Sequence, residues 1–154
     1  QYTEWTRCGS APSANQAFET NTGSGDAGVP ADLKMPECLK LWQTQVIVSS
    51  PTGGCSLTGQ PLVSAMLTDG HTQTLRTWDC APMLGPASLI GAQTGICSDR
   101  VNISDDDFAG QKPMDLPYMR FYANVPVQCS LPTGKVCVDV RVVWSACENK
   151  EEND

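Results

Sequence analysis

The chain has 154 residues and a formal net charge of −7, and 40% of its residues are hydrophobic while only 18% are charged. This length fits one domain of ordinary size, and the hydrophobic content argues against wholesale disorder. No apolar run approaches the roughly 18 residues that a membrane span requires. The acidic balance argues against a nucleic-acid partner, which needs clustered Lys and Arg.

Cysteine is the most informative residue type, because its number, eight, is even and the residues are scattered along the chain. No Cys-x-x-Cys pair is present and His71 is the single histidine, so we expect no metal site and no cofactor. This pattern in a small chain predicts four disulfides formed in an oxidising compartment. A start at Gln1 fits a mature product without its signal peptide. We therefore predict a secreted, extracellular or cell-surface protein. The cysteines expected to pair are Cys8, Cys38, Cys55, Cys80, Cys97, Cys129, Cys137 and Cys147.

The N-terminal part of the chain differs in composition from the rest. From Gly9 to Pro36 it is rich in Gly, Ser, Ala, Asn, Thr and Pro and shows neither strand nor helix periodicity. We therefore predict an extended arm over residues 1–37, a β-sandwich domain over 38–147 and an acidic tail over 148–154.

Two aromatic residues near the start of this arm, Tyr2 and Trp5, are the expected anchors of the arm. They dock either on a neighbouring copy, as an assembly arm, or on their own domain, to which Cys8 then ties them. An extended segment can add a strand to an open sheet edge, which makes the first possibility a route to self-assembly.

Alternation predicts strands beyond Cys38. From Val136 to Val142 every second residue is valine, which is typical of a strand with one apolar face. Further candidate strands cover residues 41–49, 61–68, 72–78 and 118–129, and only Cys38 to Gln43 hints at a short helix. Short strands separated by turn signals predict an all-β fold, a disulfide-stapled antiparallel β-sandwich of immunoglobulin-like type.

Local spacing suggests one disulfide. If residues 127–129 and 136–137 flank a hairpin centred on Thr133, Cys129 and Cys137 lie opposite each other, at a distance that suits a disulfide. The alternative is that each cysteine ties this hairpin to a different element. Pro126, inside the preceding strand, predicts an edge strand or a bulge.

Residues with catalytic or binding chemistry are few. His71 lies in an Asp-Gly-His-Thr stretch typical of an exposed turn, and no Gly-x-Ser-x-Gly motif accompanies it. Asp105 to Asp107 lack the spacing of an EF-hand and indicate a solvated acidic loop. Asn102-Ile103-Ser104 is an acceptor sequon, so we predict an N-linked glycan on an exposed Asn102. We predict no enzymatic activity and no catalytic residue.

An order of features from Gln60 onward carries a family resemblance. Trp78-Asp79-Cys80-Ala81-Pro82 is followed by Gly95-Ile96-Cys97, an acidic loop, Met119-Arg120-Phe121 and a valine-rich strand that leads to Cys147. This order resembles the C-terminal half of the zona pellucida-type polymerisation module. The chain departs from that family because the 59 residues upstream are too few for its other half, and an acidic stretch replaces the basic cleavage site. The resemblance implies an immunoglobulin-like sandwich that polymerises outside the cell.

Three functions remain open from the sequence. The favoured one is a structural protein, which forms a homo-oligomer, filament, coat or matrix of identical subunits. Docking of the N-terminal arm on a neighbour is one route to this assembly. The alternative is a secreted module that binds a lipid or another small apolar ligand between its sheets. A secreted hydrolase, for which His71 is the best candidate residue, is the least favoured.

Overall fold

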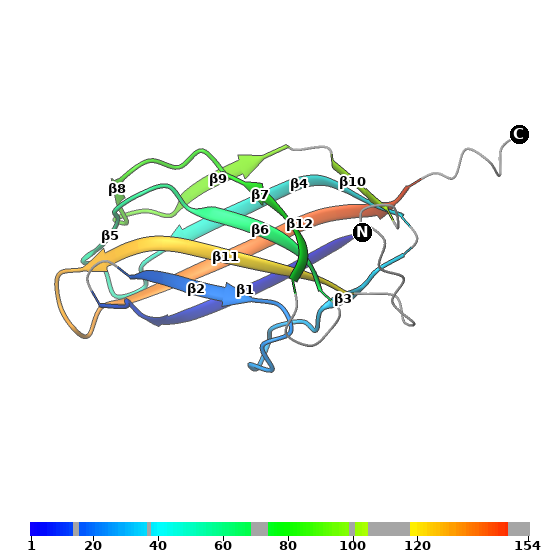
Figure 1. Cartoon of the computed structure of the whole chain (residues 1–154). Helices are drawn as coiled ribbons and strands as arrows, with labels where there is room; N and C mark the ends of the chain where they lie inside the picture. Colours follow the sequence, from blue (N-terminus) through cyan, green and yellow to red (C-terminus); the bar gives the residue numbers. More distant parts are fainter. Residues whose placement is uncertain (14–15, 37, 69–73, 99–100, 105–117, 148–154) are drawn as a thin grey trace, which may run out of the picture.

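The computed structural model describes residues 1–13, 16–36, 38–68, 74–98, 101–104 and 118–147. Within these ranges the regular elements are all strands, which form two antiparallel sheets packed face to face (Figure 1). The predicted all-β sandwich with four disulfides is confirmed. The strands are β1 (Tyr2–Ser10), β2 (Ala17–Asn21), β3 (Leu33–Lys34), β4 (Cys38–Ser49), β5 (Cys55–Leu57), β6 (Leu62–Thr68), β7 (Thr74–Cys80), β8 (Ala87–Ser88), β9 (Gln93–Cys97), β10 (Val101–Ser104), β11 (Tyr118–Cys129) and β12 (Lys135–Ala146).

The first sheet has five strands in the order β1-β12-β4-β10, with β9 also paired to β4. β12 lies between β1 and β4, and its valines form part of the core. Val136, Val138 and Val140 are fully buried, as the alternation predicts, while the residues between them face away from the core. β1 is therefore the strand at one edge of this sheet.

The second sheet has seven strands in the order β7-β6-β11-β5-β8, and β2 and β3 also pair with β11. Met119, Phe121 and Ala123 of β11 alternate into the core with exposures of at most 1%. β11 pairs with β6 up to Asn124 and with β5 from Val127 onward, and Pro126 lies between these two stretches. β11 is thus an interior strand, and the edge strand predicted from Pro126 is wrong; the proline instead lies where the pairing partner of β11 changes.

The predicted short helix over Cys38 to Gln43 is wrong, because these residues open the long strand β4. Leu39 is fully buried and Leu41 packs against the core, so the two leucines follow the period of a strand. Pairing with β12 on one side and β10 on the other satisfies the backbone, which overrides the weak local preference for helix.

The prediction of an extended N-terminal arm is also corrected. β1 pairs with β12 along its whole length, and β2 and β3 pair with β11. The composition of this segment hides its strands, because Trp5, Phe18 and Thr20 are the buried residues of β1 and β2 and most of the others are polar or small. These strands are stabilised by pairing with β11 and β12, whose sequences carry the stronger signal.

All eight cysteines are paired, which confirms that part of the prediction. The pairing of Cys129 with Cys137 is wrong, because β11 and β12 belong to different sheets and the loop between them crosses the sandwich. Each of the two cysteines is instead joined to a different element, as in the alternative. The disulfides are Cys8–Cys137, Cys38–Cys147, Cys55–Cys129 and Cys80–Cys97.

Candidate functional site: the open edge of β1

The outer side of β1 carries backbone groups that are free to pair. The Trp144 N–H donates to the Gln1 carbonyl at 2.9 Å, so these two residues form a hydrogen-bonded pair. Such pairs alternate with non-hydrogen-bonded pairs along an antiparallel ladder. The even-numbered residues of β1 therefore turn their N–H and C=O groups away from β12. Those residues are Tyr2, Glu4, Thr6, Cys8 and Ser10.

The Cys8–Cys137 disulfide supports this phase. The two Cα atoms lie 4.0 Å apart, which fits the closer spacing of non-hydrogen-bonded pairs, about 4.5 Å, rather than the 5.5 Å or so of hydrogen-bonded ones. In the part of the chain that the structure describes, no backbone group pairs with the outward edge of β1. β1 thus offers a nine-residue edge to an incoming strand.

β1 is held firmly in its own sheet. Trp5 is 2% exposed and its Nε1 donates to Thr20 Oγ1 of β2 at 2.9 Å, so the side chain spans the two sheets. The Trp144 Nε1 donates to Thr3 Oγ1 at 3.2 Å, and the disulfide fixes the other end of the strand. Trp5 is therefore a core residue of its own subunit and not an anchor on a neighbour.

Tyr2, the other predicted anchor, is 58% exposed. The Arg141 guanidinium carbon lies 4.4 Å from the centre of the Tyr2 ring, and Arg141 Nε lies 3.9 Å from a carboxylate oxygen of Glu4. These contacts order side chains on the outer face of the first sheet, directly beside the open edge.

Asp139 faces Thr6 across the β1–β12 pair. Burial, and then the negative charge of Glu4, raise the pKa of the Asp139 carboxyl, while the Thr6 hydroxyl and Arg141 act in the opposite direction. The Asp139 Oδ1 is buried and has no hydrogen-bond partner among the described residues. The folded chain therefore disfavours the ionised form of the Asp139 carboxyl.

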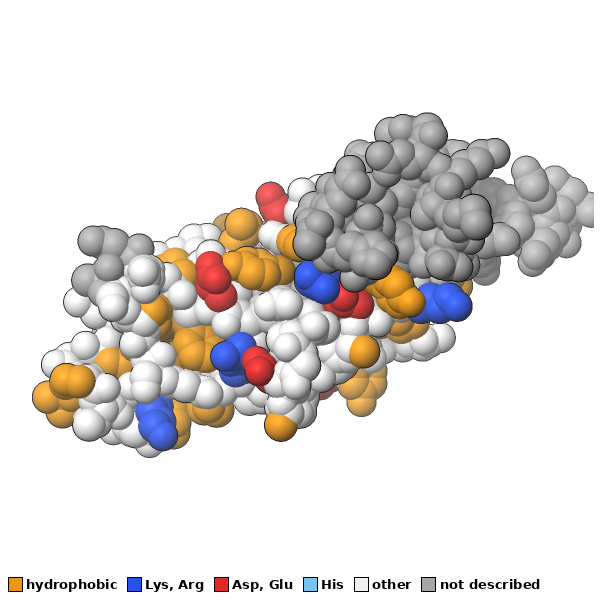
Figure 2. All heavy atoms as spheres, turned by 60° about the horizontal axis from the view of Figure 1, so that its bottom comes forward, with side chains coloured by type: hydrophobic (Ala, Val, Ile, Leu, Met, Phe, Trp, Pro, Cys, Tyr) orange, Lys and Arg blue, Asp and Glu red, His pale blue; other side chains and the backbone are white. Residues whose placement is uncertain are grey.

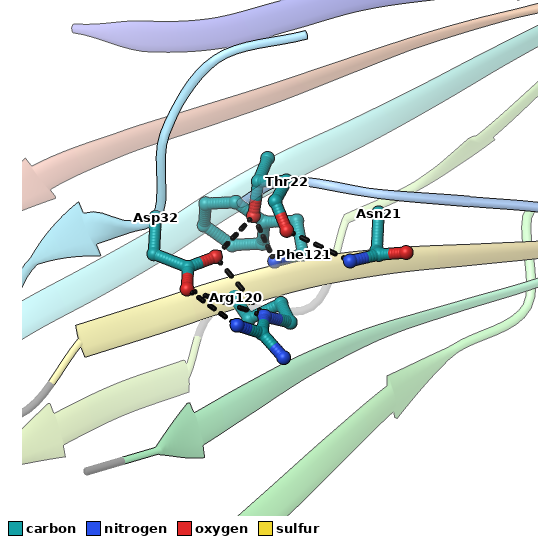
Figure 3. Close-up of polar contacts among 5 residues, drawn as sticks. All are labelled: Asn21, Thr22, Asp32, Arg120 and Phe121. Carbon is teal, nitrogen blue, oxygen red and sulfur yellow. Dashed lines mark hydrogen bonds and ion pairs between the residues drawn. The ribbon is translucent and has the colours of Figure 1, made fainter. Parts of the chain in front are cut away.

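A second polar cluster fastens the Gly-rich loop that follows β2 (Figure 3). Arg120 on β11 donates from Nε and Nη2 to the Asp32 carboxylate at 2.9 to 3.2 Å. The Thr22 hydroxyl donates to Asp32 Oδ1 at 3.1 Å and accepts the Phe121 N–H at 2.9 Å. The hydrogen bonds to Asp32 raise the pKa of Arg120, which therefore stays charged.

This cluster also explains a glycine of the loop. Gly23 has φ = 74°, and a Cβ there would lie 2.5 Å from an Asp32 carboxylate oxygen. At the same loop, Arg7 of β1 forms an ion pair with Asp26 at 2.8 Å. The described polar groups of this cluster bind one another, so we assign it to loop anchoring.

The space between the sheets holds a cavity of about 100 Å³, which is lined by Leu41, Thr44, Val63, Ala65, Trp78, Asp79, Cys80, Val101, Phe121 and Val142. Cavities that bind drug-sized ligands measure about 300–1,000 Å³. Asp79 at the rim accepts a 2.7 Å hydrogen bond from the Ser64 hydroxyl. The cavity is too small for a lipid, so the apolar-ligand alternative gains no support from this cavity.

The remaining predicted residues divide into two groups. Asn102 lies exposed on β10, at the edge of the first sheet opposite β1. His71, Asp105 to Asp107 and the acidic tail lie outside the described residues. Among the residues that are described, no three potential ligands gather around a metal position, and no helix has the length and apolar character to cross a membrane.

Comparisons with known proteins give architectural likenesses alone. Neither the protein-family models nor the curated protein sequences contain a match. Among solved structures, a chain of infectious bursal disease virus, Gx strain, aligns over 97% of this chain with 9% identity and a TM-score of 0.43. An empty virus-like particle of cowpea mosaic virus aligns over 97% of this chain and 84% of its own, with 10% identity and a TM-score of 0.34. A cyclase from Fischerella sp. TAU aligns over 96% of this chain and 86% of its own, with 11% identity and a TM-score of 0.40.

This chain spans about a third of the bursal disease virus chain, 33% of its length. The viral proteins and the cyclase resemble this chain equally weakly, so we draw no function from these likenesses.

Proposed function

We propose that the chain is an extracellular structural subunit that associates with further copies of itself into a filament, coat or matrix. The observation that carries the proposal is the open edge of β1, a nine-residue strand whose even-numbered residues turn their backbone groups outward. The Cys8–Cys137 disulfide and the hydrogen bond from Trp5 to Thr20 hold this strand in place. Such an edge is a template for pairing with another chain. Natural proteins commonly blunt long edges with Pro, charged side chains or a covering element. β1 contains neither Pro nor Lys, and its two charged residues, Glu4 and Arg7, each form an ion pair within the chain.

The face of the molecule in Figure 2 supports the same function. Figure 2 turns the underside of Figure 1 forward, and the charged side chains on this face are few, of both signs and set among polar and hydrophobic ones. A neighbour can therefore approach without a large electrostatic barrier. Four disulfides fit an oxidising, extracellular location and suit a durable subunit. The relation to the zona pellucida module and the absence of enzymatic activity remain predictions.

The predicted N-linked glycan belongs to this proposal. Asn102 is exposed on β10, at the opposite edge of the first sheet from β1. A glycan attached there would cover that edge and hinder its pairing. The first sheet would then have one edge shielded and one edge open.

Sedimentation velocity of the protein secreted from eukaryotic cells, with its disulfides intact, tests the proposal. We expect species that are integral multiples of the subunit, with a proportion that rises with concentration. A single species at the mass of one glycosylated chain across the micromolar range would overturn the proposal.

A further inference from the structure

We infer that two copies of the chain pair through β1, antiparallel and about a two-fold axis at Thr6, so that the two five-stranded sheets become one continuous sheet. This inference rests on the proposed function and names the partner and the register of its contact. The partner surface is a second β1, because a two-fold contact places the same patch on both sides. Such a contact closes at the dimer, so a larger assembly would be built from these dimers through a further contact.

Geometry restricts the possible registers. In an antiparallel pair, directly opposed residues share one face of the sheet, and a two-fold axis normal to the sheet keeps the outer face outward for both copies. The axis must therefore lie level with one residue of β1, midway between the two copies of that residue, rather than level with the bond between two residues. Even-numbered residues then oppose even-numbered ones, which are those with outward backbone groups. A second β1 can consequently satisfy this edge fully.

Charge excludes two of these registers. An axis at Glu4 places the two Glu4 carboxylates directly opposite each other, close to the carboxyl group of Asp139. An axis at Arg7 opposes two guanidinium groups. Like charges directly opposite across a strand pair are destabilising. An axis at Thr6 opposes Thr6 to itself and Glu4 to the disulfide-bonded Cys8, and so avoids both repulsions.

Length then selects Thr6. This residue is the midpoint of β1, which runs from Tyr2 to Ser10, so an axis there pairs all nine residues of the strand. Five opposed hydrogen-bonding pairs, with Thr6 counted once as its own partner, give up to about ten backbone hydrogen bonds. Registers centred one or more residues away leave one end of β1 unpaired.

Cysteine cross-linking reads this register directly. Hydrogen-bonded opposed residues have Cα atoms about 5.5 Å apart, within the 4.4–6.8 Å or so that a disulfide spans. Thr6→Cys should therefore form a covalent homodimer under mild oxidation. The matched control Tyr2→Cys, on the same face and equally outward, should stay uncross-linked, because in this register residue 2 lies opposite Ser10. The readout is non-reducing electrophoresis, with loss of the dimer band after reduction.

The outcomes separate this inference from the proposed function. A covalent dimer for Thr6→Cys and none for Tyr2→Cys supports the register. A dimer for Tyr2→Cys instead, or no dimer for Thr6→Cys while the wild-type chain sediments as an oligomer, overturns the register and leaves self-association standing. If the wild-type chain is monomeric, the proposed function and this inference both fail. Native tryptophan fluorescence, to which the buried Trp5 contributes, checks that each variant is folded.

Discussion

At the scale of single residues, stability and electrostatics rest on a few polar contacts that ordinary composition does not reveal. Asp32 joins a Gly-rich loop to β11 through Arg120 and Thr22, and its side chain is only 13% exposed. Asp26 in the same loop pairs with Arg7 at the surface, where both side chains are more than 40% exposed. The two aspartates thus form a natural comparison of a shielded and a solvated ion pair.

We expect Asp32→Ala to lower the free energy of unfolding by about 1.5–3 kcal/mol, because it removes charged hydrogen bonds and leaves Arg120 without them. Asp26→Ala should cost about 0.5 kcal/mol or less, as surface ion pairs do. Urea unfolding followed by tryptophan fluorescence measures both. Equal losses for the two variants would show that the Asp32 contacts do not anchor the loop.

Asp139 gives a pH-dependent prediction. Burial and Glu4 raise the pKa of this carboxyl in the folded chain above its unfolded value, so the proton binds the folded state more tightly. Stability from this group is present below the ordinary carboxyl pKa and is lost as the pH rises through the raised pKa. Asp139→Asn, which keeps the shape without the charge, should therefore be more stable than the wild type at neutral pH.

Thermal unfolding at several pH values tests this. The advantage of Asp139→Asn should shrink as the pH falls and vanish below the ordinary carboxyl pKa. A wild-type chain that is the more stable of the two at neutral pH would contradict the assigned cause.

At the scale of elements, the strands with a continuous internal signal are the ones that the sequence predicts well. β12 and β11 are read from their alternation because they are interior strands whose apolar faces are complete. β1, β2 and β3 lie at sheet edges and consist mostly of polar or small residues, so their composition is that of a loop. Their strand character comes from partners more than 80 residues away in sequence, which no local pattern encodes.

The candidate site was only partly predictable for the same reason. Tyr2, Trp5 and Cys8 mark an anchored N-terminus in the sequence, but whether Trp5 enters its own core or a neighbour's depends on the β1–β12 register. Disulfide pairing depends likewise on sheet assignment, since Cys129 and Cys137 are close in sequence but lie on opposite sheets. The open edge itself is a property of strand order, which the sequence does not state.

The Cys8–Cys137 disulfide makes a prediction about β1 as a unit. Replacing both cysteines with alanine should cost about 2–5 kcal/mol of stability and, more specifically, should raise the amide exchange rate of β1. The Thr3, Trp5 and Arg7 amides, which face β12, should lose protection while those of β11 keep theirs. Replacement of the Cys55–Cys129 pair in the other sheet is the matched control. Unchanged protection of β1 would mean that strand pairing and Trp5 alone hold the edge.

At the scale of the whole molecule, the described residues form two packed sheets, and the outward backbone groups of β1 have no partner among them. The sheets enclose a core in which β12 and β11 are the central strands, and the disulfides brace both sheets and link β7 to β9 across them. The cavity of about 100 Å³ between the sheets leaves little room for a ligand. The proposed function is therefore self-association through the β1 edge.

Sedimentation velocity of Thr6→Pro against Thr6→Ala tests that claim most directly. Both variants lose the hydroxyl beside Asp139, but only proline removes the outward N–H, and proline is tolerated on an edge strand when that N–H faces solvent. We predict that Thr6→Ala assembles as the wild type does, whereas Thr6→Pro, with its fold intact by circular dichroism, sediments as a monomer of about the chain mass of 16.5 kDa plus any glycan. A folded Thr6→Pro that assembles as fully as Thr6→Ala would contradict the account.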